Sequence, residues 1–488
     1  MELIFEKSVA GRRGYLLPKT DVPVSASIPE QFQRKRDCPF PEVTELDVVR
    51  HFTRLSHLNY SVDTHFYPLG SCTMKYNPKF TEQVAAMPQF CEVHPILPQL
   101  KNGELLTQGA LFVLYEMDKL LSEITGMDAF TMQPLAGAHG ELTGVMIMAA
   151  YHKAQKNKKK YIIVPDAAHG TNPATAAIAG YETISVKSNA TGVIDIDQLK
   201  QCINDDVAGL MLTCPNTHGI FNMDIDKITK MVHDVDGLMY YDGANLNAIL
   251  GRCRPGDIGF DIVHVNLHKT FATPHGGGGP GSGPVGVCEK LAPYLPISRI
   301  CKRDNDTYFL NYDYPQSIGY IASFYGNFGI VLRAYAYILQ LGKEGLMAIS
   351  DHSVLNANYL REQLKKYYHL PYDRICMHEC VFSAVEQAQR GVHAIDIAKF
   401  LIDHDLHPPT VYFPLTVKEA LMIEPTESES KETLDLFVDK MIQADELSRS
   451  NPASFHDRPK TTCISRPDEV KAAREINTNY FAEEKPDD

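Results

Sequence analysis

Short apolar runs alternate with longer helical stretches through the middle of the chain. Between Thr107 and Ile124, apolar residues recur at the three- and four-residue spacing of an amphipathic helix. Strands are then predicted at Ala129–Met132, Tyr161–Val164, Glu182–Val186, Ala208–Leu212, Leu238–Tyr241 and Ile262–Val265. Because parallel strands need long crossovers, usually helical, this alternation predicts a mainly parallel sheet wrapped by helices.

A smaller α+β region is predicted after this layer. Its helices are expected at Phe328–Leu341, Asp351–Tyr368, Ala394–His404 and Ser430–Met441, and its strands at Val381–Ala384 and Ala420–Ile423. The first hundred residues are rich in proline and histidine and show little periodicity, which is typical of an extended arm. The predicted divisions are an arm at 1–100, a large domain at 101–327, a small domain at 328–450 and a polar tail at 451–488.

Composition limits the class of protein. A chain of 488 residues exceeds the usual size of one core, and a net charge of −13 argues against nucleic-acid binding. The 11 cysteines lack the repeated close spacing of a disulfide framework or a zinc site, so we expect free thiols and no metal. No apolar segment is long enough to cross a membrane, and the acidic opening segment lacks signal-peptide features. A cytoplasmic enzyme is expected.

A single lysine follows the last predicted strand of the sheet. Lys269 stands beside His268 and before the glycine tract 276–279. A partly buried lysine amine captures an aldehyde as a Schiff base, and pyridoxal phosphate is the commonest aldehyde cofactor held in this way. For a lone His–Lys pair, a strand-end lysine reaching solvent is the commoner interpretation. A second feature is therefore needed to favour a cofactor site.

Asp242 supplies that feature, at the end of the apolar run Leu238–Tyr241. Neighbouring parallel strands bring their carboxyl ends to one edge, and enough chain separates Asp242 from Lys269 for a return crossover. An aspartate there holds a pyridine nitrogen protonated, so that the ring acts as an electron sink. Alone, Asp242 is more simply a turn residue, but together with Lys269 it favours a cofactor site.

Three further segments offer candidate contacts. The glycine-rich run 135–144 presents backbone N–H groups at a predicted helix start, which favours a phosphate, although such a run is often only a tight connection. His169 is a candidate to lie flat on the cofactor ring. Thr171 and Asn172 offer donors to a substrate carboxylate or the phosphate, with a capping role equally open. Asn216 is a candidate for the ring hydroxyl, or an ordinary turn residue.

Six motifs carry a resemblance to a known family. They are YPLGSCTMKYNP (67–78), QPLAGAHGE (133–141), AHGTNPA (168–174), YDGANLNA (241–248), RPGDIGFD (254–261) and NLHKTFATPHGGGGPGSGP (266–284). Together they resemble the glycine cleavage system P-protein family over nearly the whole chain. The length and the opening arm resemble the second subunit of its split form.

The resemblance implies a fold and a set of site residues. The fold is the α/β, fold type I architecture of pyridoxal-phosphate-dependent transferases, like aspartate aminotransferase, with a smaller C-terminal α+β domain. Lys269 would be the Schiff-base lysine, Asp242 the partner of the pyridine nitrogen, and His169 and Ala244 the residues on the two ring faces. The residues implied near the phosphate are His268, Ala136, Gly137 and Ala138. Those implied to approach from the arm are Ser71, Cys72, Thr73, Met74 and Lys75.

The implied activity is decarboxylation of glycine, with transfer of the aminomethyl group to the lipoyl arm of H-protein. The implied partner is subunit 1, in a heterotetramer of two unlike pairs, because small residues such as Gly137 and Ala244 leave room that a partner would close. Another pyridoxal-phosphate decarboxylase or lyase remains an alternative, as does a non-catalytic scaffold subunit, against which Lys269 argues. Leu135 and Tyr320 depart from the family pattern, which commonly has a smaller residue and a basic residue there.

Cys72 and Cys214 lie in or near motif segments, which makes them candidates for redox chemistry. Buried, inert thiols are the simpler interpretation of both residues.

Overall fold

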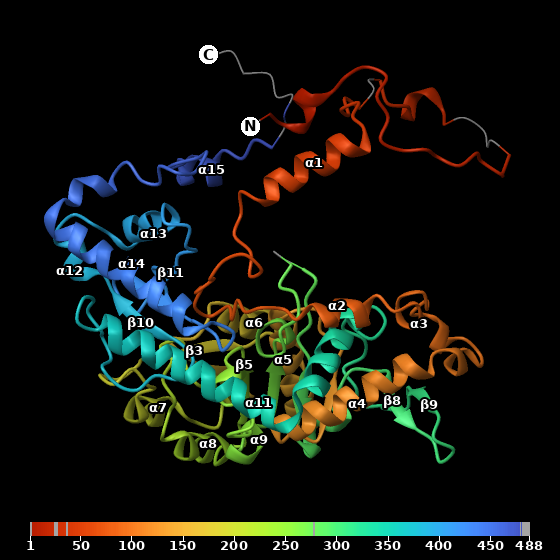
Figure 1. Ribbon diagram of the computed structural model, residues 1–488. Coiled ribbons are helices and arrows are strands. Elements are labelled where there is room, and N and C mark those ends of the chain that lie inside the picture. Colours follow the sequence, from red (N-terminus) through yellow and green to blue (C-terminus); the bar gives the residue numbers. More distant parts are fainter. Residues whose placement is uncertain (1, 24–27, 36–37, 277–278, 479, 481–488) are drawn as a thin grey trace. The chain divides into compact units, whose positions relative to one another are not determined.

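The computed structural model describes residues 2–23, 28–35, 38–276, 279–478 and 480 (Figure 1). Contacts within the chain divide it into two compact units, Met1–Ser61 and Val62–Asp488. Gly277 and Gly278 of the glycine tract lie outside the described residues.

Among its described residues, the first unit contains one α-helix, α1 (Glu45–Ser56). Its start is fixed by a capping box: the Thr44 hydroxyl accepts the Asp47 N–H at 3.1 Å, and the Asp47 carboxylate accepts the Thr44 N–H at 3.0 Å. Short 3₁₀ turns lie at Ile4–Lys7 and Glu30–Phe32. The segment predicted as an extended arm therefore contains a helix, whose sequence signals are this capping box and the helical spacing of Val48, Phe52 and Leu55.

A seven-stranded sheet forms the centre of the second unit, in the order β1-β7-β6-β5-β4-β2-β3. The strands are β1 (Ala129–Thr131), β2 (Tyr161–Pro165), β3 (Glu182–Val186), β4 (Val207–Thr213), β5 (Leu238–Gly243), β6 (Ile262–Val265) and β7 (Val285–Val287). Strand β7 runs antiparallel to both of its neighbours, and the strands from β6 to β3 are parallel. The predicted mainly parallel sheet is confirmed, with β7 as the strand that the sequence did not predict.

Helices cover both faces of this sheet (Figure 1). They are α4 (Gln108–Thr125), α5 (Gly137–Ala154), α6 (Thr171–Ile178), α7 (Ile196–Cys202), α8 (Ile225–His233), α9 (Pro255–Ile258) and α10 (Leu267–Thr270). The consecutive residues Tyr240 and Tyr241 of β5 are both fully buried, one in each of two separate cores. Side chains alternate along a strand, so a strand covered on both faces is apolar throughout.

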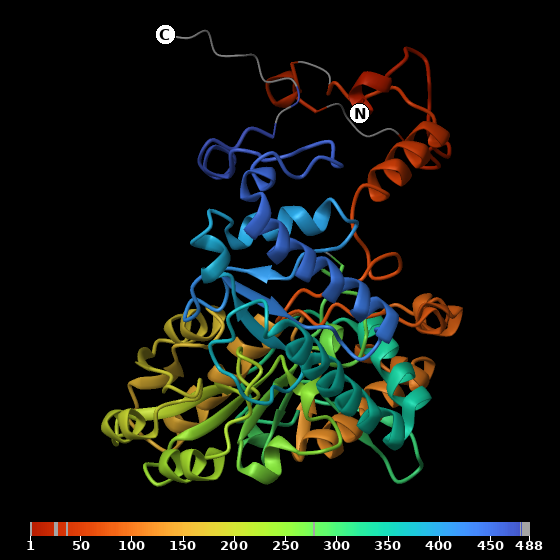
Figure 2. The same cartoon turned by 60° about the vertical axis from the view of Figure 1, so that its left-hand side comes forward.

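The C-terminal region has its own antiparallel sheet, in the order β10-β12-β11 (Figure 2). Its elements are α11 (Phe328–Leu364), β10 (Cys380–Ser383), α12 (Val385–Ala388), α13 (Ala394–Ile402), β11 (Thr410–Val411), β12 (Ala420–Ile423) and α14 (Lys431–Ser450). Helix α11 joins two helices that the sequence predicts separately, and Gly342 breaks it with a positive φ of 59°. Glycine adopts this conformation without steric cost, so the helix changes direction there.

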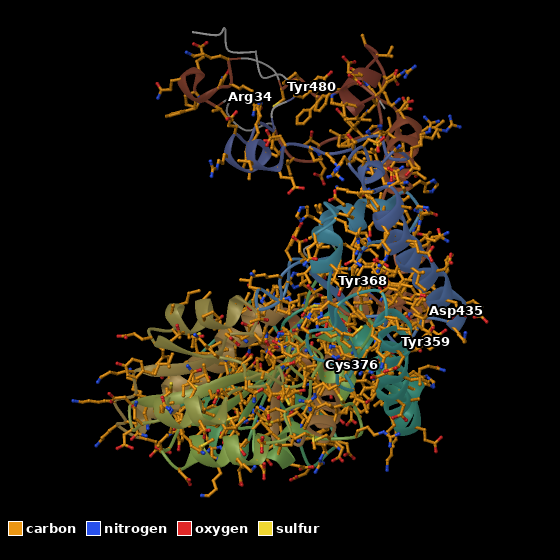
Figure 3. The ribbon with its side chains drawn as sticks, turned by 90° about the vertical axis from the view of Figure 1, so that its left-hand side faces the viewer. Arg34, Tyr359, Tyr368, Cys376, Asp435 and Tyr480 are labelled. Carbon is orange, nitrogen blue, oxygen red and sulfur yellow. The ribbon has the colours of Figure 1, made fainter. Side chains whose placement is uncertain are left out.

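Helices α11 and α14 pack together in this region. The Tyr359 hydroxyl of α11 donates to the Asp435 carboxylate of α14 (Figure 3). Tyr368, which follows α11, donates to the carbonyl of Met441 at 2.8 Å. These bonds tie α11 and the chain after it to α14, around the hydrophobic core of the C-terminal region, which we call the small core.

Short elements complete the second unit. They are α2 (Lys79–Ala85), α3 (Pro88–Cys91), β8 (Arg299–Lys302), β9 (Tyr308–Asn311) and α15 (Glu469–Arg474). In the predicted tail, Phe455 is fully buried, so the tail begins as part of the small core. Within the described residues, no helix is long and apolar enough to span a membrane.

Candidate functional site

Polar side chains gather at the carboxyl ends of β4, β5 and β6. Asp242 of β5 is in register with Thr213 of β4, and its Oδ2 accepts hydrogen bonds from Thr213 Oγ1 and Asn172 Nδ2, both at 3.3 Å. Its Oδ1 accepts the Ala244 N–H at 3.0 Å. Lys269 lies in α10, directly after β6. The sheet therefore brings the predicted aspartate and lysine to one edge, and Asn172 supports the aspartate.

A histidine supports Asp242 from the neighbouring strand. His264 Nε2 lies 3.5 Å from Asp242 Oδ1, and its Nδ1 lies 2.7 Å from the Tyr240 hydroxyl. Burial raises the pKa of Asp242, but the electrostatic effect of His264 and Lys269, together with the hydrogen bonds from Ala244 and Asn172, outweighs burial and holds that pKa below its usual value. The carboxylate is therefore ionised. Sequence reasoning missed His264, whose only signal is a polar residue inside an otherwise apolar strand.

Lys269 lies among histidines that remain neutral. Burial first, and then the charge of Lys269, lower the pKa of His169 and of His275. The same two causes lower the pKa of His268 to about 3. The rings of His268 and His275 meet edge to face, with centroids 4.9 Å apart. The histidine side chains near Lys269 therefore carry no positive charge of their own.

A hydrogen-bonded chain leads from His169 to a buried carboxyl group. His169 Nδ1 lies 2.9 Å from Thr171 Oγ1, which lies 2.9 Å from Glu141 Oε1. Burial and the charge of Asp242 raise the pKa of Glu141 to about 8. Glu141 stands in one of the family motifs, but no local pattern in the sequence assigns it a role.

The predicted phosphate cradle is the amino-terminal end of α5. Ala136 is the N-cap and Gly137 begins the helix, so the first-turn N–H groups face outward from the 18-residue helix. A Cβ on Gly137 would lie 2.4 Å from Asn266 Oδ1, and one on Gly283 would lie 2.2 Å from the Ala136 carbonyl oxygen. Glycine is required at both positions because two loops approach each other closely.

Several buried polar atoms nearby have no hydrogen-bond partner within the described part of the chain. They are Glu141 Oε2, Asn172 Oδ1, Asn266 Oδ1, Thr270 Oγ1, Thr273 Oγ1 and Ser282 Oγ. Buried polar atoms are paired in most proteins, so a group of this kind indicates a site that a polar ligand completes. The hydroxyl donors, the helix terminus and Lys269 fit a phosphorylated aldehyde.

The segment 71–75 from the predicted arm reaches this site. The Ser71 N–H donates to Glu379 Oε2 at 2.9 Å, and the Thr73 N–H donates to Glu424 Oε2 at 3.0 Å. Burial raises the pKa of the Cys72 thiol, whose surroundings also include Lys269 and both carboxyl groups. Of the predicted arm residues, Cys72 is therefore close enough to feel the charge of Lys269, while Ser71 and Thr73 are bonded to the carboxyl groups beside it.

Lys75 continues the same segment. Its Nζ donates to the Thr270 carbonyl at 2.8 Å and to Glu427 Oε1 at 2.6 Å. The lysine is buried, so its ion pair with Glu427 is shielded from water. Lys75 thus connects α10, which carries Lys269, to the segment that follows β12.

Fully buried carboxyl groups hold this arm. His378, Glu379 and Glu424 place possible ligand atoms within 4.8 Å of one another, but Glu424 is already bonded to Thr73. Burial, and then the charge of Glu424, raise the pKa of Glu379 well above its usual value. Sequence reasoning missed both glutamates because nothing local connects them to the arm.

Asn216 lies in a tight turn. Its Oδ1 accepts the N–H groups of His218 and Ile220 at 3.0 and 3.1 Å, and its Nδ2 donates to the Gly192 carbonyl at 2.6 Å. Cys214 is buried, and burial raises the pKa of its thiol to about 12. Leu135 and Tyr320 are both exposed.

Two family descriptions match this chain. Residues 19–307 match the glycine cleavage system P-protein, and residues 349–458 match the C-terminal domain of glycine dehydrogenase. A curated relative from Caldanaerobacter subterraneus, named probable glycine dehydrogenase (decarboxylating) subunit 2, is 55% identical over 97% of each chain. One of the same name from Bacillus cytotoxicus is 54% identical over 98% of this chain and 97% of its own.

Solved structures share the fold. A glycine decarboxylase (P-protein) of the glycine cleavage system, in inhibitor-bound form, superposes with a TM-score of 0.70 at 17% identity, covering 85% of this chain and 93% of that chain. Glutamate decarboxylase from Lactobacillus brevis superposes with a TM-score of 0.62 at 13% identity, covering 89% and 96%. The predicted fold class and the predicted resemblance are confirmed. The chain belongs to the glycine cleavage system P-protein family.

Proposed function

We propose that this chain binds pyridoxal phosphate covalently through Nζ of Lys269 and, together with a partner subunit, decarboxylates glycine. The aminomethyl group that remains passes to the lipoyl arm of H-protein. When bound, the cofactor ring accepts the electron pair that the departing carbon dioxide leaves behind. The observation that carries the proposal is the position of Lys269 beside an ionised, buried Asp242 in a chain of this family.

The residues around Lys269 have distinct tasks in this proposal. Asp242, held by His264 and Asn172, keeps the pyridine nitrogen protonated. His169 covers one ring face, and the small side chain of Ala244 leaves room on the other. The neutral imidazoles add no positive charge of their own beside Lys269.

The amino-terminal end of α5 is the proposed phosphate site. Its N–H groups and the helix dipole favour an anion. Ser282, Thr270 and Thr273 supply hydroxyl donors that are otherwise unpaired among the described residues. The phosphate would therefore be bound mainly by neutral donors, with His268 nearby.

A homologous subunit 1 and lipoylated H-protein are the proposed partners, in a heterotetramer of two unlike pairs. The relatives are named as subunit 2, which supports a divided enzyme. Small residues at Ala136, Gly137 and Ala244 favour closure by another chain. Binding of a substrate as small as glycine needs such closure to exclude larger amino acids.

The decisive experiment measures labelled carbon dioxide released from carboxyl-labelled glycine by this chain with subunit 1 and lipoylated H-protein. Release is expected only when all three proteins are present, and it is expected to disappear in Lys269→Ala. Lys187→Ala is the matched control. It removes an exposed lysine that is distant from Lys269 in the sequence, and it should retain release. Release by Lys269→Ala would contradict the catalytic proposal, and full release without subunit 1 would contradict the divided site.

A further inference from the structure

The chain Glu141–Thr171–His169 has two possible hydrogen arrangements. The hydroxyl of Thr171 carries a single hydrogen, yet it lies 2.9 Å from Glu141 Oε1 and 2.9 Å from His169 Nδ1. It can donate to only one of these atoms and must accept from the other. The protonation of the carboxyl group and the tautomer of the imidazole are therefore linked through one hydroxyl.

We propose that Glu141 is a positioning residue that, through Thr171, selects which ring nitrogen of His169 carries the hydrogen. The inference deepens the proposed function, on which it rests for the part that His169 plays beside the cofactor.

In the first arrangement Glu141 is ionised. Its carboxylate accepts the Thr171 hydroxyl, and Thr171 Oγ1 accepts a hydrogen from His169 Nδ1. Nε2 of His169 is then a bare acceptor. In the second arrangement Glu141 is protonated and donates to Thr171 Oγ1, while the hydroxyl donates to a bare Nδ1. Nε2 then carries the hydrogen and acts as a donor.

The backbone favours the second arrangement. The N–H of Thr171 also points at His169 Nδ1, at 3.3 Å, and it can donate only if Nδ1 is bare. Glu141 is buried, its second oxygen has no partner in the described part of the chain, and burial is the main cause that favours its neutral form. A neutral Glu141 and an Nε2–H imidazole are thus consistent with each other.

The conversion is a balanced proton relay. One proton from solvent binds Nε2 of His169, the Nδ1 hydrogen passes to Thr171 Oγ1, and the original hydroxyl hydrogen passes to Glu141 Oε1. The ring is neutral before and after, which matters because burial and the charge of Lys269 oppose an imidazolium. His169 can therefore exchange a proton at Nε2 while the charge changes at Glu141.

The charges that face Glu141 come from two elements. Asp242 on β5 favours the protonated carboxyl group, and Lys269 on α10 favours the ionised one. Tyr240 on β5 feels the charge of Glu141 and remains neutral, since burial raises its pKa. Binding of a cofactor at Lys269 changes this balance, so the titration should be followed with and without pyridoxal phosphate.

The test is nuclear magnetic resonance of the full chain with isotope-labelled histidine, in which His169→Gln identifies the resonances of His169. Without cofactor, the ring-nitrogen shifts should change from the Nε2–H to the Nδ1–H tautomer as the pH rises through about 8. Glu141→Gln, whose amide donates permanently to Thr171, should hold the Nε2–H form throughout. Thr171→Ser should retain the change, and Thr171→Val should abolish it.

Glu429→Gln is the matched control, because burial raises the pKa of Glu429 to about 7 and, within the described residues, no hydrogen bond or ion pair links it to His169. This variant should leave the tautomer change intact. An unchanged tautomer in the wild-type chain, or a change that survives in Glu141→Gln, would overturn the inference. Because neither glycine nor cofactor is needed, a failure here differs from a failure of decarboxylation.

Discussion

Thr73 bonds to both carboxyl oxygens of Glu424, across 351 residues of sequence: its N–H donates at 3.0 Å and its hydroxyl at 2.5 Å. Asn247 donates to the same carboxyl group at 3.4 Å. One buried side chain of the C-terminal region thus holds the arm segment and the turn after β5. Thr73 has a positive φ of 49°, which is an unfavourable backbone conformation for a residue other than glycine. Its hydrogen bonds to the distant Glu424 hold it in that conformation.

Replacing Glu424 tests this anchor. Glu424→Ala leaves the buried donors of Thr73 without an acceptor, so the free energy of unfolding should fall by about 3 kcal/mol. Amide hydrogen exchange at residues 71–75 should accelerate, while exchange in β2 should follow only the global change. Glu344→Ala, which removes an exposed carboxylate, is the control and should alter neither quantity. Unchanged exchange in the arm would contradict the anchoring role.

Removing Lys75 should be costly for a different reason. Lys75→Met leaves the carboxylate of Glu427 poorly solvated and without its cation, and breaking such a pair costs about 3–5 kcal/mol. Urea denaturation of the single and double variants measures this. Lys75→Met combined with Glu427→Gln should recover part of the loss, because the uncompensated charge is gone. Strictly additive losses would show that the two side chains do not interact.

Glu141 should make stability depend on pH. Its pKa is raised to about 8 in the fold, against a usual value near 4.5. Between these values the native state binds more protons than the unfolded state, so the free energy of unfolding falls as pH rises, by at most about 1.4 kcal/mol per pH unit. Denaturation of the cofactor-free chain should show a shallower decline in Glu141→Gln than in the wild type. Equal slopes would indicate that Glu141 titrates normally.

The glycine of the proposed cradle is open to a direct comparison. Gly137→Ala places a methyl group against Asn266 and should weaken pyridoxal phosphate binding by about tenfold or more, which corresponds to about 1.4 kcal/mol. Gly109→Ala is the control. Gly109 lies in α4, where an added Cβ would be 3.7 Å from Phe90, and alanine favours a helix more than glycine does. Absorbance titration with the cofactor measures both. Equal affinities would place the phosphate elsewhere.

The sequence predicts the large sheet well because its inner strands are buried on both faces. Strands β2, β4, β5 and β6 are mostly apolar runs, whereas the edge strand β3 is largely exposed and mixes polar with apolar residues. The order of helices and strands indicates parallel pairing. The ends of parallel strands meet at one edge, which is why Lys269 and Asp242 can be paired without a structure. Strand β7 escapes prediction because Val285–Val287 is too short to give a pattern.

Residues that act through distant contacts could not be predicted in this way. Glu379 and Glu424 lie at the ends of the small sheet, and their bonds to Ser71 and Thr73 form only in the complete fold. Periodicity in a sequence shows which face of a helix or strand is buried. The bonds of Glu379 and Glu424 depend instead on which distant segment packs against them.

The long separation between Thr73 and Glu424 also governs when the site can form during synthesis. A ribosome makes the segment 71–75 early, and Lys269 much later, but the carboxyl group that holds the segment is added only after β12. A nascent chain with Lys269 already exposed beyond the exit tunnel therefore still lacks the arm's anchor. The arm segment can therefore form its bonds to Glu424 only once the chain has been made as far as the end of β12.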